Sequence, residues 1–502
     1  MFKNVLIILI LLMCVGLFPN GAVNEQWDSD SIMILKIKIE NNIPAVQSVT
    51  VKPGYMKNGC RDFSLPADNG LPSLYLYDSM GNMIYMTAFG YPLARTVPPR
   101  LNPADDSHAP DMLQITDPEI YLLVPYMRDV KTIEIYNPGE SLPQYTAELD
   151  SLDVRFEKGL DSFIPTRQRK AVDGEKFHLL IIASGFTAAD MNTFTSKAEE
   201  FKNYLLAVEP FLTGAPLMEV HIYENLEDLG CATGCYNIDR LLCCDSGKVI
   251  SAAVNSGYLF DEIIVMHKTL TYSGGGFTEY MDAYRTNSYT SYAMVYSGTY
   301  FKEVALHEFG HSFGNLCDEY TYTTEGSSYS LCVNCRENCS DWSHITDACQ
   351  LSCSAMNDYY RPEDSIMLSL SIPYFNRVSI FSTYMPHGLE RRLRFFTGQE
   401  VQVYLQLQVE RQEEHAWIIR KEFAAVQLTV DNPGDIAVAK FVVYRQEGNG
   451  FQAIKEILPS ELQGGSFSFT DEDLGKNMTY IYKVEAQDTE GKIVGISNLV
   501  TI

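Results

Sequence analysis

The sequence lacks three things, and each absence narrows the function. Basic residues are in deficit, since 64 Asp and Glu face 38 Lys and Arg, which gives a net charge of −26. Nucleic-acid binding needs a basic surface to match the phosphates, so this balance argues against a nucleic-acid partner. After residue 22 no apolar run is long enough to cross a bilayer, and we expect no transmembrane span in the mature, soluble chain. Histidine is scarce, with 9 in 502 residues, so a motif with two closely spaced histidines would rarely arise by chance.

The N-terminus has the one long apolar run. Lys3 precedes an apolar stretch from Val5 to Phe18, which is too short to span a membrane comfortably. A charged start and the small residues Gly21-Ala22 predict a secretory signal peptide over residues 1–22. Acylation at Cys14 would instead make a lipoprotein, but the bulky Met13 before it disfavours this reading. We therefore expect an exported protein, secreted or at the cell surface.

The most informative stretch is His307-Glu308-Phe309-Gly310-His311, an HExxH pattern. Residues four apart share a helix face, so His307 and His311 can both direct nitrogen atoms at one ion. Two imidazoles suit Zn²⁺, and a third ligand and a water would complete its tetrahedral coordination. Glu308 is then placed to act as general base. The alternative is a chance pattern on an amphipathic helix, expected on the order of once in a hundred such chains.

The third ligand must come from the residues after the helix. Gly314 permits a sharp turn that brings the chain back toward the ion. Asp318 is the first choice, because a carboxylate is an acceptable zinc ligand. Glu319 and Cys317 remain alternatives, although Cys317 lies among many cysteines with which it can pair.

Together, the residues from His307 to Tyr320, read as HEFGHSFGxLxDEY, resemble the IgA-peptidase family of bacterial zinc metallopeptidases. Two further stretches agree, Cys231 to Asp245 and the segment from Tyr360-Arg361-Pro362 to Ser365-Ile366-Met367. The resemblance spans roughly residues 175 to 390, and Cys317 departs from its pattern. The family is named for immunoglobulin cleavage by some members, which does not establish the substrate of this chain.

The resemblance implies an α/β, metzincin-like zinc peptidase domain. Zinc would be held by His307, His311 and Asp318, with Glu308 as the catalyst. Met367 is the expected methionine of the tight turn beneath the metal, with Met356 as its competitor. An exposed edge strand near the zinc is expected to pair with extended substrate, and the glycines at 274–276 are either part of this surface or a flexible turn. Three tyrosines are candidates to stabilise the oxyanion: Tyr320, Tyr359 and Tyr360.

Cysteine use also points outside the cell. Of the 12 cysteines, ten lie between Cys231 and Cys353, a clustering that predicts disulfides in an exported protein. A second, structural zinc site remains the alternative for the five cysteines at positions 332, 335, 339, 349 and 353. The isolated Cys60 is expected to be the free thiol.

The remaining sequence favours β-structure on both sides of the catalytic domain. We expect a β-sandwich-like domain at 27–155, the zinc peptidase domain at 175–392 and a fibronectin type III-like β-sandwich domain at 398–502. The basic stretch Arg167-Gln168-Arg169-Lys170 is a linker or a processing site.

The sequence thus predicts an exported zinc metalloendopeptidase that acts on proteins or peptides, with host glycoproteins such as immunoglobulins as one substrate class. The alternative is a non-catalytic surface-binding protein that retains a structural metal. Glu308 favours the enzyme, because a structural ion has no need of it. The oligomeric state cannot be predicted.

Overall fold

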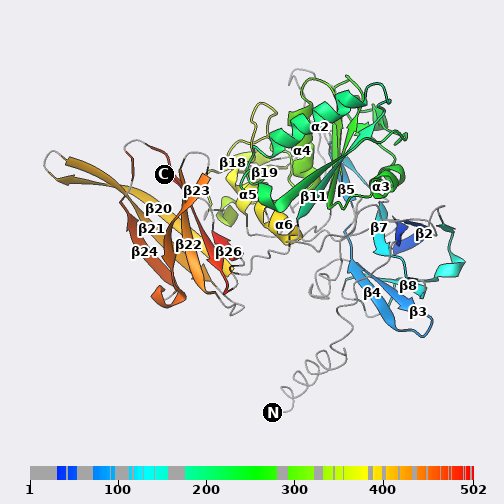
Figure 1. Cartoon of the computed structure of the whole chain (residues 1–502), viewed down its shortest axis with the longest axis horizontal. Coiled ribbons are helices and arrows are strands. Elements are labelled where there is room, and N and C mark those ends of the chain that lie inside the picture. Colours follow the sequence, from blue (N-terminus) through cyan, green and yellow to red (C-terminus); the bar gives the residue numbers. More distant parts are fainter. Residues whose placement is uncertain are drawn as a thin grey trace, which may run out of the picture.

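The computed structural model describes residues 31–502 with gaps (Figure 1). The gaps are 41–42, 54–71, 91, 97–111, 116–117, 128, 139, 141, 157–175, 280–291, 321–331, 343–344, 354–355, 383–387, 398–402, 417–418, 432–437, 448–449, 464, 473, 476–477, 490, 492 and 498–499. The expected signal peptide, Cys14, Cys60 and the Arg167–Lys170 stretch lie outside the described residues. No described helix is both long and apolar enough to cross a membrane.

The N-terminal part forms two four-stranded sheets around one core. Alternate residues of β1, such as Met33, Leu35 and Ile37, point into this core, where they meet Leu74 and Leu76 of the second sheet. The first sheet consists, in spatial order, of β10 (Val154–Phe156), β2 (Ile43–Pro53), β1 (Ser31–Glu40) and β7 (Glu119–Pro125); the second consists of β4 (Met83–Ala88), β3 (Ser73–Asp78), β8 (Val130–Tyr136) and β9 (Tyr145–Glu148), followed by the 3-10 turn η2 (Leu149–Ser151).

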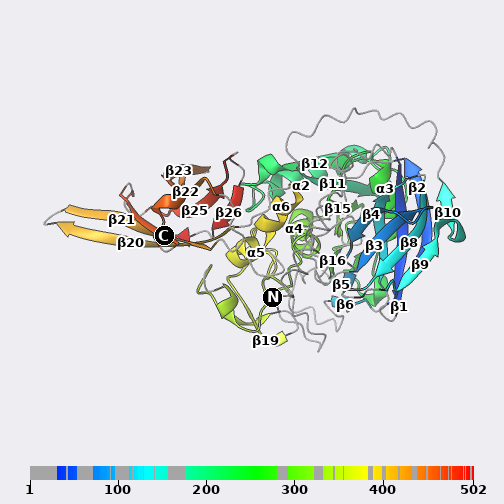
Figure 2. The same cartoon turned by 90° about the horizontal axis from the view of Figure 1, so that it is seen from below.

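The other face of β1 is buried as well. Ile32 and Ile34 belong to a second core, which they share with the helix α3 (Ser246–Asn255). Lys52 of β2 donates a hydrogen bond of 2.9 Å to the hydroxyl of Ser251 in the same helix. The N-terminal part therefore packs on the central part of the molecule, and α3 forms the contact between them (Figure 2).

The centre of the molecule is a seven-stranded sheet. Strands β11, β12, β15 and β17 are parallel, whereas β16 runs antiparallel to β17. Two strands from the N-terminal region, β5 and β6, extend the sheet beyond β16. The order is β12 (Met218–Tyr223), β11 (Phe177–Ser184), β15 (Glu262–His267), β17 (Ala293–Tyr296), β16 (Gly274–Glu279), β5 (Pro92–Thr96) and β6 (Met112–Gln114).

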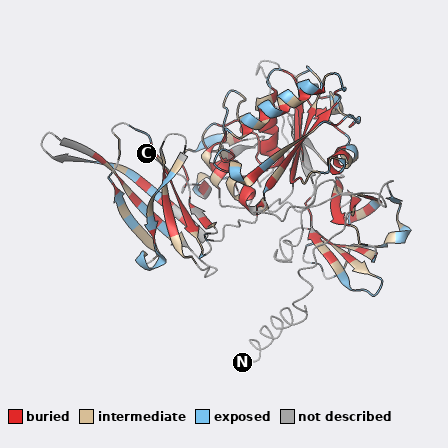
Figure 3. Ribbon diagram, viewed as in Figure 1, coloured by how far each residue is buried: buried red, intermediate tan, exposed pale blue. Residues whose placement is uncertain are grey.

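Helices cover both faces of this sheet, which explains the continuous apolar run of β11. Leu179 and Ile181 pack on one face with α2 and α4, whereas Leu180 and Ile182 pack on the other face with α3. The resulting burial of the sheet is visible in Figure 3. The remaining helices are α2 (Met191–Leu205), α4 (Phe301–Ser312), α5 (Arg377–Phe381) and α6 (Leu389–Phe396), with the 3-10 turns η3 (Ala215–Leu217), η4 (Cys235–Asn237) and η5 (Cys339–Trp342) and two short hairpins, β13 (Ala232–Thr233) with β14 (Leu242–Cys243) and β18 (Gln350–Cys353) with β19 (Met356–Arg361).

The C-terminal part is a single hydrogen-bonded sheet of eight strands over one apolar cluster. Its longest pair, β20 and β21, projects as a hairpin at the left of Figure 1. The fibronectin type III-like arrangement stays a prediction. The strands are β20 (Val403–Ala416), β21 (Ile419–Asp431), β22 (Lys440–Glu447), β23 (Gly450–Ile457), β24 (Ser466–Asp471), β25 (Ile481–Gln487), β26 (Ile493–Ser497) and β27 (Val500–Thr501), with the 3-10 turn η6 (Pro459–Glu461).

All ten clustered cysteines are paired, so the prediction of disulfides is confirmed. The five cysteines that could have held a structural zinc each belong to a disulfide bond, which rules out that alternative for them. The bonds are Cys231–Cys244, Cys235–Cys243, Cys317–Cys332, Cys335–Cys353 and Cys339–Cys349.

Candidate metal centre and active site

The helix α4 carries the HExxH residues in the interior of the molecule. Val304, Leu306 and Phe309 anchor it in the core between the central sheet and the segments that follow it. His307 and His311 are 0% and 1% exposed, so neither imidazole can rely on water for its hydrogen bonds. Buried polar groups need partners inside the protein, and the partners of these two rings define the site.

Three donor atoms converge beside α4. The Nε2 atoms of His307 and His311 lie 3.0 Å apart. One carboxylate oxygen of Asp318, Oδ1, lies 3.0 Å from Nε2 of His307 and 3.3 Å from Nε2 of His311. A tetrahedral zinc with bonds near 2.0–2.1 Å would separate its ligands by about 3.3 Å. The three side chains therefore have the spacing of ligands around one small ion.

The opposite nitrogen of each ring settles its protonation. Nδ1 of His307 lies 3.0 Å from the carbonyl oxygen of Ile366, and Nδ1 of His311 lies 2.7 Å from that of Leu316. A carbonyl oxygen only accepts, so each Nδ1 carries the hydrogen and each Nε2 presents a lone pair to Asp318. Three acceptors facing one another repel unless a cation lies among them, and this donor set fits such a cation.

Electrostatics keep Asp318 in the form that a cation needs. Burial opposes ionisation of its carboxyl group, but a positive charge at the Nε2 atoms of His311 and His307, supplied by protons when no metal is bound, outweighs burial and lowers the pKa of Asp318 below the usual range.

A sharp turn returns the chain from the end of α4 to Asp318. Asn315, with φ of 49°, adopts the left-handed conformation of this turn, which we had assigned to Gly314. Gly314 is required for a different reason, because a Cβ there would lie 2.6 Å from both the carbonyl oxygen of Gly310 and Cδ2 of Leu389. The helix end and α6 therefore approach each other too closely for a side chain at 314.

Met367 packs against α4 at Gly310. It is fully buried, and a Cβ on Gly310 would come within 2.7 Å of its sulfur atom. The hydroxyl of Ser365 accepts a hydrogen bond from the backbone N–H of Met367, which forms a tight turn. The side chain of the competing Met356 lies outside the described residues.

The comparison with protein families decides the identity of this part of the chain. Residues 167–418, just over half of the 502 residues, match the family model described as IgA Peptidase M64. The chain belongs to this family. The resemblance seen in the sequence is thereby confirmed, and the match supports a peptidase function.

Two other comparisons add no argument about this M64 peptidase. No curated protein matches it. Among solved structures, pectate lyase PelI from Erwinia chrysanthemi in complex with tetragalacturonic acid is 20% identical, with a TM-score of 0.14, over 19% of this chain and 28% of that chain. Pectate lyase Pel3 from Pectobacterium carotovorum is 19% identical, with a TM-score of 0.13, over 18% and 25%. A structure titled "Myokine structure" is 18% identical, with a TM-score of 0.13, over 18% and 89%. The chain thus spans about a quarter of the pectate lyases, and these scores are too low to indicate a shared fold.

The two alternative ligands of the M64 peptidase point elsewhere. Cys317 forms a disulfide bond with Cys332 and has no thiolate to offer. The carboxylate of Glu319 accepts hydrogen bonds from Asn334 at 3.0 Å, Ser365 at 2.8 Å and Asn376 at 2.6 Å. Burial raises the pKa of Glu319 to about 7. Glu319 therefore connects the loop that carries Asp318 to the turn at Ser365–Met367. It does not point at the three side chains that could hold a metal.

The close approach of β16 to Glu308 is not evident from the sequence. A Cβ on Gly274 would lie 2.7 Å from Cγ1 of Val304 and 3.1 Å from Oε1 of Glu308. The glycines at 274–276 are therefore in a strand that lies against the helix, and not in a flexible turn. Close approach of two backbones is one reason for glycine within a strand.

Tyr272 was also missed. Burial raises its pKa well above the usual range, and the negative charge of Glu308 raises it further. Of the three expected tyrosines, Tyr359 donates its hydroxyl hydrogen to Glu337 at 3.0 Å. Tyr360 exchanges two backbone hydrogen bonds with Arg336. Tyr320 follows the ligand loop and is half-buried.

Proposed function

We propose that this M64 peptidase is an exported zinc-dependent endopeptidase with a metzincin-like catalytic domain. The observation that carries the proposal is the convergence of His307, His311 and Asp318, with ring tautomers fixed so that all three present lone pairs to one point. Glu308 is beside them on the same helix. A domain built from four parallel strands, one antiparallel strand beside α4 and helices on both faces is consistent with this class.

The ligands would be His307, His311 and Asp318. Zinc bound there would supply a Lewis acid that lowers the pKa of water and polarises the peptide carbonyl. The hydrogen bonds from the imidazole Nδ1–H groups to backbone carbonyls hold both rings in the orientation that binding requires.

Glu308 moves the proton in the proposed reaction. Its carboxylate takes a proton from the water whose oxygen attacks the peptide carbonyl carbon. The protonated Glu308 then delivers that proton to the departing amide nitrogen, so the carbon–nitrogen bond breaks and the carboxylate is regenerated. Burial of Glu308 at 0% exposure limits competition from bulk water at this oxygen.

The covalent chemistry of the chain supports export. Five disulfide bonds need an oxidising compartment, which supports an extracellular location together with the expected signal peptide at 1–22. The substrates would be proteins or peptides, including host glycoproteins such as immunoglobulins. We propose the domain limits given above, 27–155, 175–392 and 398–502, with β5 and β6 as exceptions that join the central sheet.

The test compares wild type with Glu308→Gln on a panel of proteins that includes immunoglobulins, with zinc content measured in both. Glu303→Gln is the matched control. It also removes one carboxylate from α4, but from the first turn of the helix and not from the HExxH pattern. We expect Glu308→Gln to retain zinc and to lose about 10²- to 10⁴-fold in cleavage rate, while the control stays active. Folded, zinc-loaded wild type that cleaves nothing would support the binding-protein alternative instead.

A further inference from the structure

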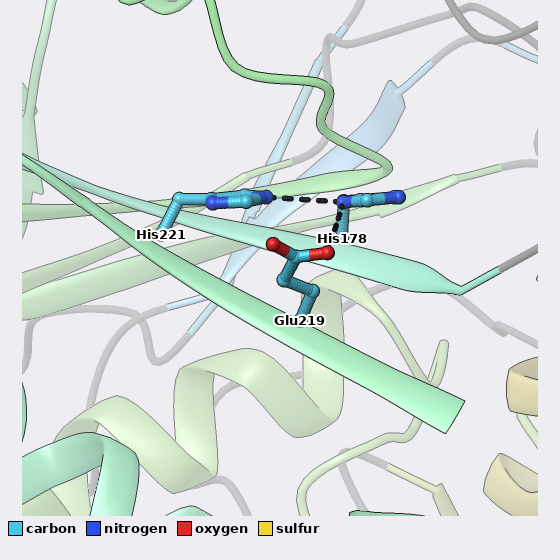
Figure 4. A group of neighbouring side chains, drawn as sticks. All are labelled: His178, Glu219 and His221. Atoms are coloured by element: carbon cyan, nitrogen blue, oxygen red, sulfur yellow. Dashed lines mark hydrogen bonds and ion pairs between the residues drawn. The ribbon is translucent and has the colours of Figure 1, made fainter. Parts of the chain in front are cut away.

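A second group of metal-ligand side chains lies at one edge of the central sheet. His178 is the second residue of β11, and Glu219 and His221 belong to the edge strand β12 (Figure 4). One nitrogen or oxygen atom of each residue lies within 4.8 Å of the other two. The active site described above uses none of these residues.

Strand register places the three side chains together. β11 and β12 are parallel, with His178 opposite Glu219 and Leu180 opposite His221. Residues opposite each other point to the same face, and so do residues two apart on one strand. His178, Glu219 and His221 therefore share one face of the sheet.

The contacts show two nitrogen atoms and a carboxylate facing one another. Nδ1 of His178 lies 3.0 Å from Nε2 of His221 and 4.0 Å from Oε2 of Glu219. The ring of Tyr258 stacks on His221, with centroids 4.5 Å apart, and supports that imidazole from the side. A hydrogen bond between two imidazole nitrogens needs one proton between two lone pairs.

We propose that His178, Glu219 and His221 form a second metal site, which binds a divalent ion of the zinc class. The ion takes the place of the proton that the two imidazoles share. The ring that carried this proton gives it up to solvent and takes one up at its other nitrogen, so both imidazoles stay neutral and each presents a lone pair. The two rings are nearly parallel in the hydrogen-bonded form, at 6°. They turn about their side-chain torsions so that both lone pairs point at the ion, while Glu219 supplies an oxygen.

The donor set selects the ion. Two imidazoles and one carboxylate suit zinc, copper or nickel, whereas calcium and magnesium require mostly oxygen ligands. Glu219 is 51% exposed and His178 12% exposed in their side chains, so the ion enters from solvent on the Glu219 side and keeps water as its remaining ligand.

This site is separate from the catalytic centre. His178 lies on the face of β11 that carries Leu180 and Ile182, and this face packs on α3. The neighbouring Phe177 lies on the other face and contacts Phe313 at the end of α4, with ring centroids 4.9 Å apart. The sheet therefore stands between the two groups of ligands.

An ion at this position would connect β12 to the rest of the sheet. β12 is the last strand of its sheet and pairs only with β11 among the described strands. Ligands from both strands join them independently of the backbone hydrogen bonds. Binding to the folded state alone raises the melting temperature.

The test measures zinc bound by the full-length protein at equilibrium, with Zn²⁺ alone as the probe. We expect two equivalents in wild type and one in His221→Ala, with its cleavage rate unchanged when the catalytic site is filled. Glu219→Gln keeps the side-chain shape and should weaken the second equivalent more than about 10-fold. Glu199→Gln on α2 removes an exposed carboxylate elsewhere and should retain both equivalents.

A spectroscopic measurement and a second variant separate the outcomes. Co²⁺ should give visible absorption bands for two sites, of which His221→Ala loses one and His311→Ala loses the other. If His221→Ala binds as much metal as wild type, or wild type binds one ion that only His311→Ala loses, the second site is refuted and the proposed function stands. If the single ion is lost in His221→Ala and retained in His311→Ala, the proposed function fails instead. Circular dichroism of each variant checks that it is folded.

Discussion

The approach of β16 to α4, the helix that carries Glu308, gives the sharpest prediction. In Gly274→Ala the new methyl group would lie 2.7 Å from Cγ1 of Val304 and 3.1 Å from Oε1 of Glu308. The contact of 2.7 Å is too short for two carbon atoms and the one of 3.1 Å is tighter than usual, so we expect strand and helix to separate by several tenths of an ångström. Overpacking of this kind costs about 1–3 kcal/mol in the free energy of unfolding. Because a displacement of 1 Å costs about 100-fold in rate, a shift of the proposed general base by several tenths of an ångström should cost on the order of 10-fold.

The adjacent glycine provides the control. In Gly275→Ala the methyl group points to the other face, 2.9 Å from the carbonyl oxygen of Leu242 and 3.3 Å from Cε of Met294. This substitution should reduce stability to a similar extent without touching Glu308. The assay is kcat on one peptide substrate, corrected for folded, zinc-loaded protein, beside urea unfolding of both variants. A Gly274→Ala enzyme that turns over as fast as Gly275→Ala would refute the reasoning.

Four further predictions follow from contacts described above. Chelation of the metal should abolish cleavage, and Zn²⁺ should restore it; activity that persists in metal-free protein would contradict the proposed mechanism. Met367→Leu conserves volume and should cost less than about 1.5 kcal/mol, whereas Met367→Ala should cost about 2–5 kcal/mol, both from denaturant melts. Asn334→Ala removes hydrogen bonds to the backbone N–H and C=O of Cys317, at 2.9 and 2.8 Å, and should cost about 1–3 kcal/mol with weaker zinc retention. Burial opposes ionisation of Glu485, but Lys483 outweighs it and lowers the pKa of Glu485, so the stability from this carboxylate is present above the usual Glu pKa of about 4.3 and is lost as pH falls below it. Thermal melts at several pH values should show this loss in wild type and a smaller one in Lys483→Met.

Local patterns explain how much of the site the sequence could reveal. The i, i+4 spacing of His307 and His311 needs only one helix, and α4 (Phe301–Ser312) carries both residues. Asp318 could be predicted as a ligand because it follows the second histidine, His311, within a few residues. The partners of Glu319 come from segments far along the chain, and no spacing rule connects them.

The misses share a physical cause, which is that strand pairing is not encoded locally. β16 was missed because three successive glycines have low strand propensity, and only the helix behind them explains their presence. The second group of ligands is invisible until the register of β11 and β12 is known.

The pairing of β5 with β16 determines what can be isolated as a working unit. The family match begins at residue 167, whereas β5 and β6 end at Thr96 and Gln114. A fragment that starts at residue 167 would leave the backbone groups of β16 from Gly276 to Glu279 without their partner strand, and would expose the surface of α3 that Ile32 and Ile34 cover. Unpaired sheet edges promote aggregation. We therefore expect the peptidase to be purified in soluble form only with its N-terminal part, which serves as a permanent portion of the catalytic scaffold.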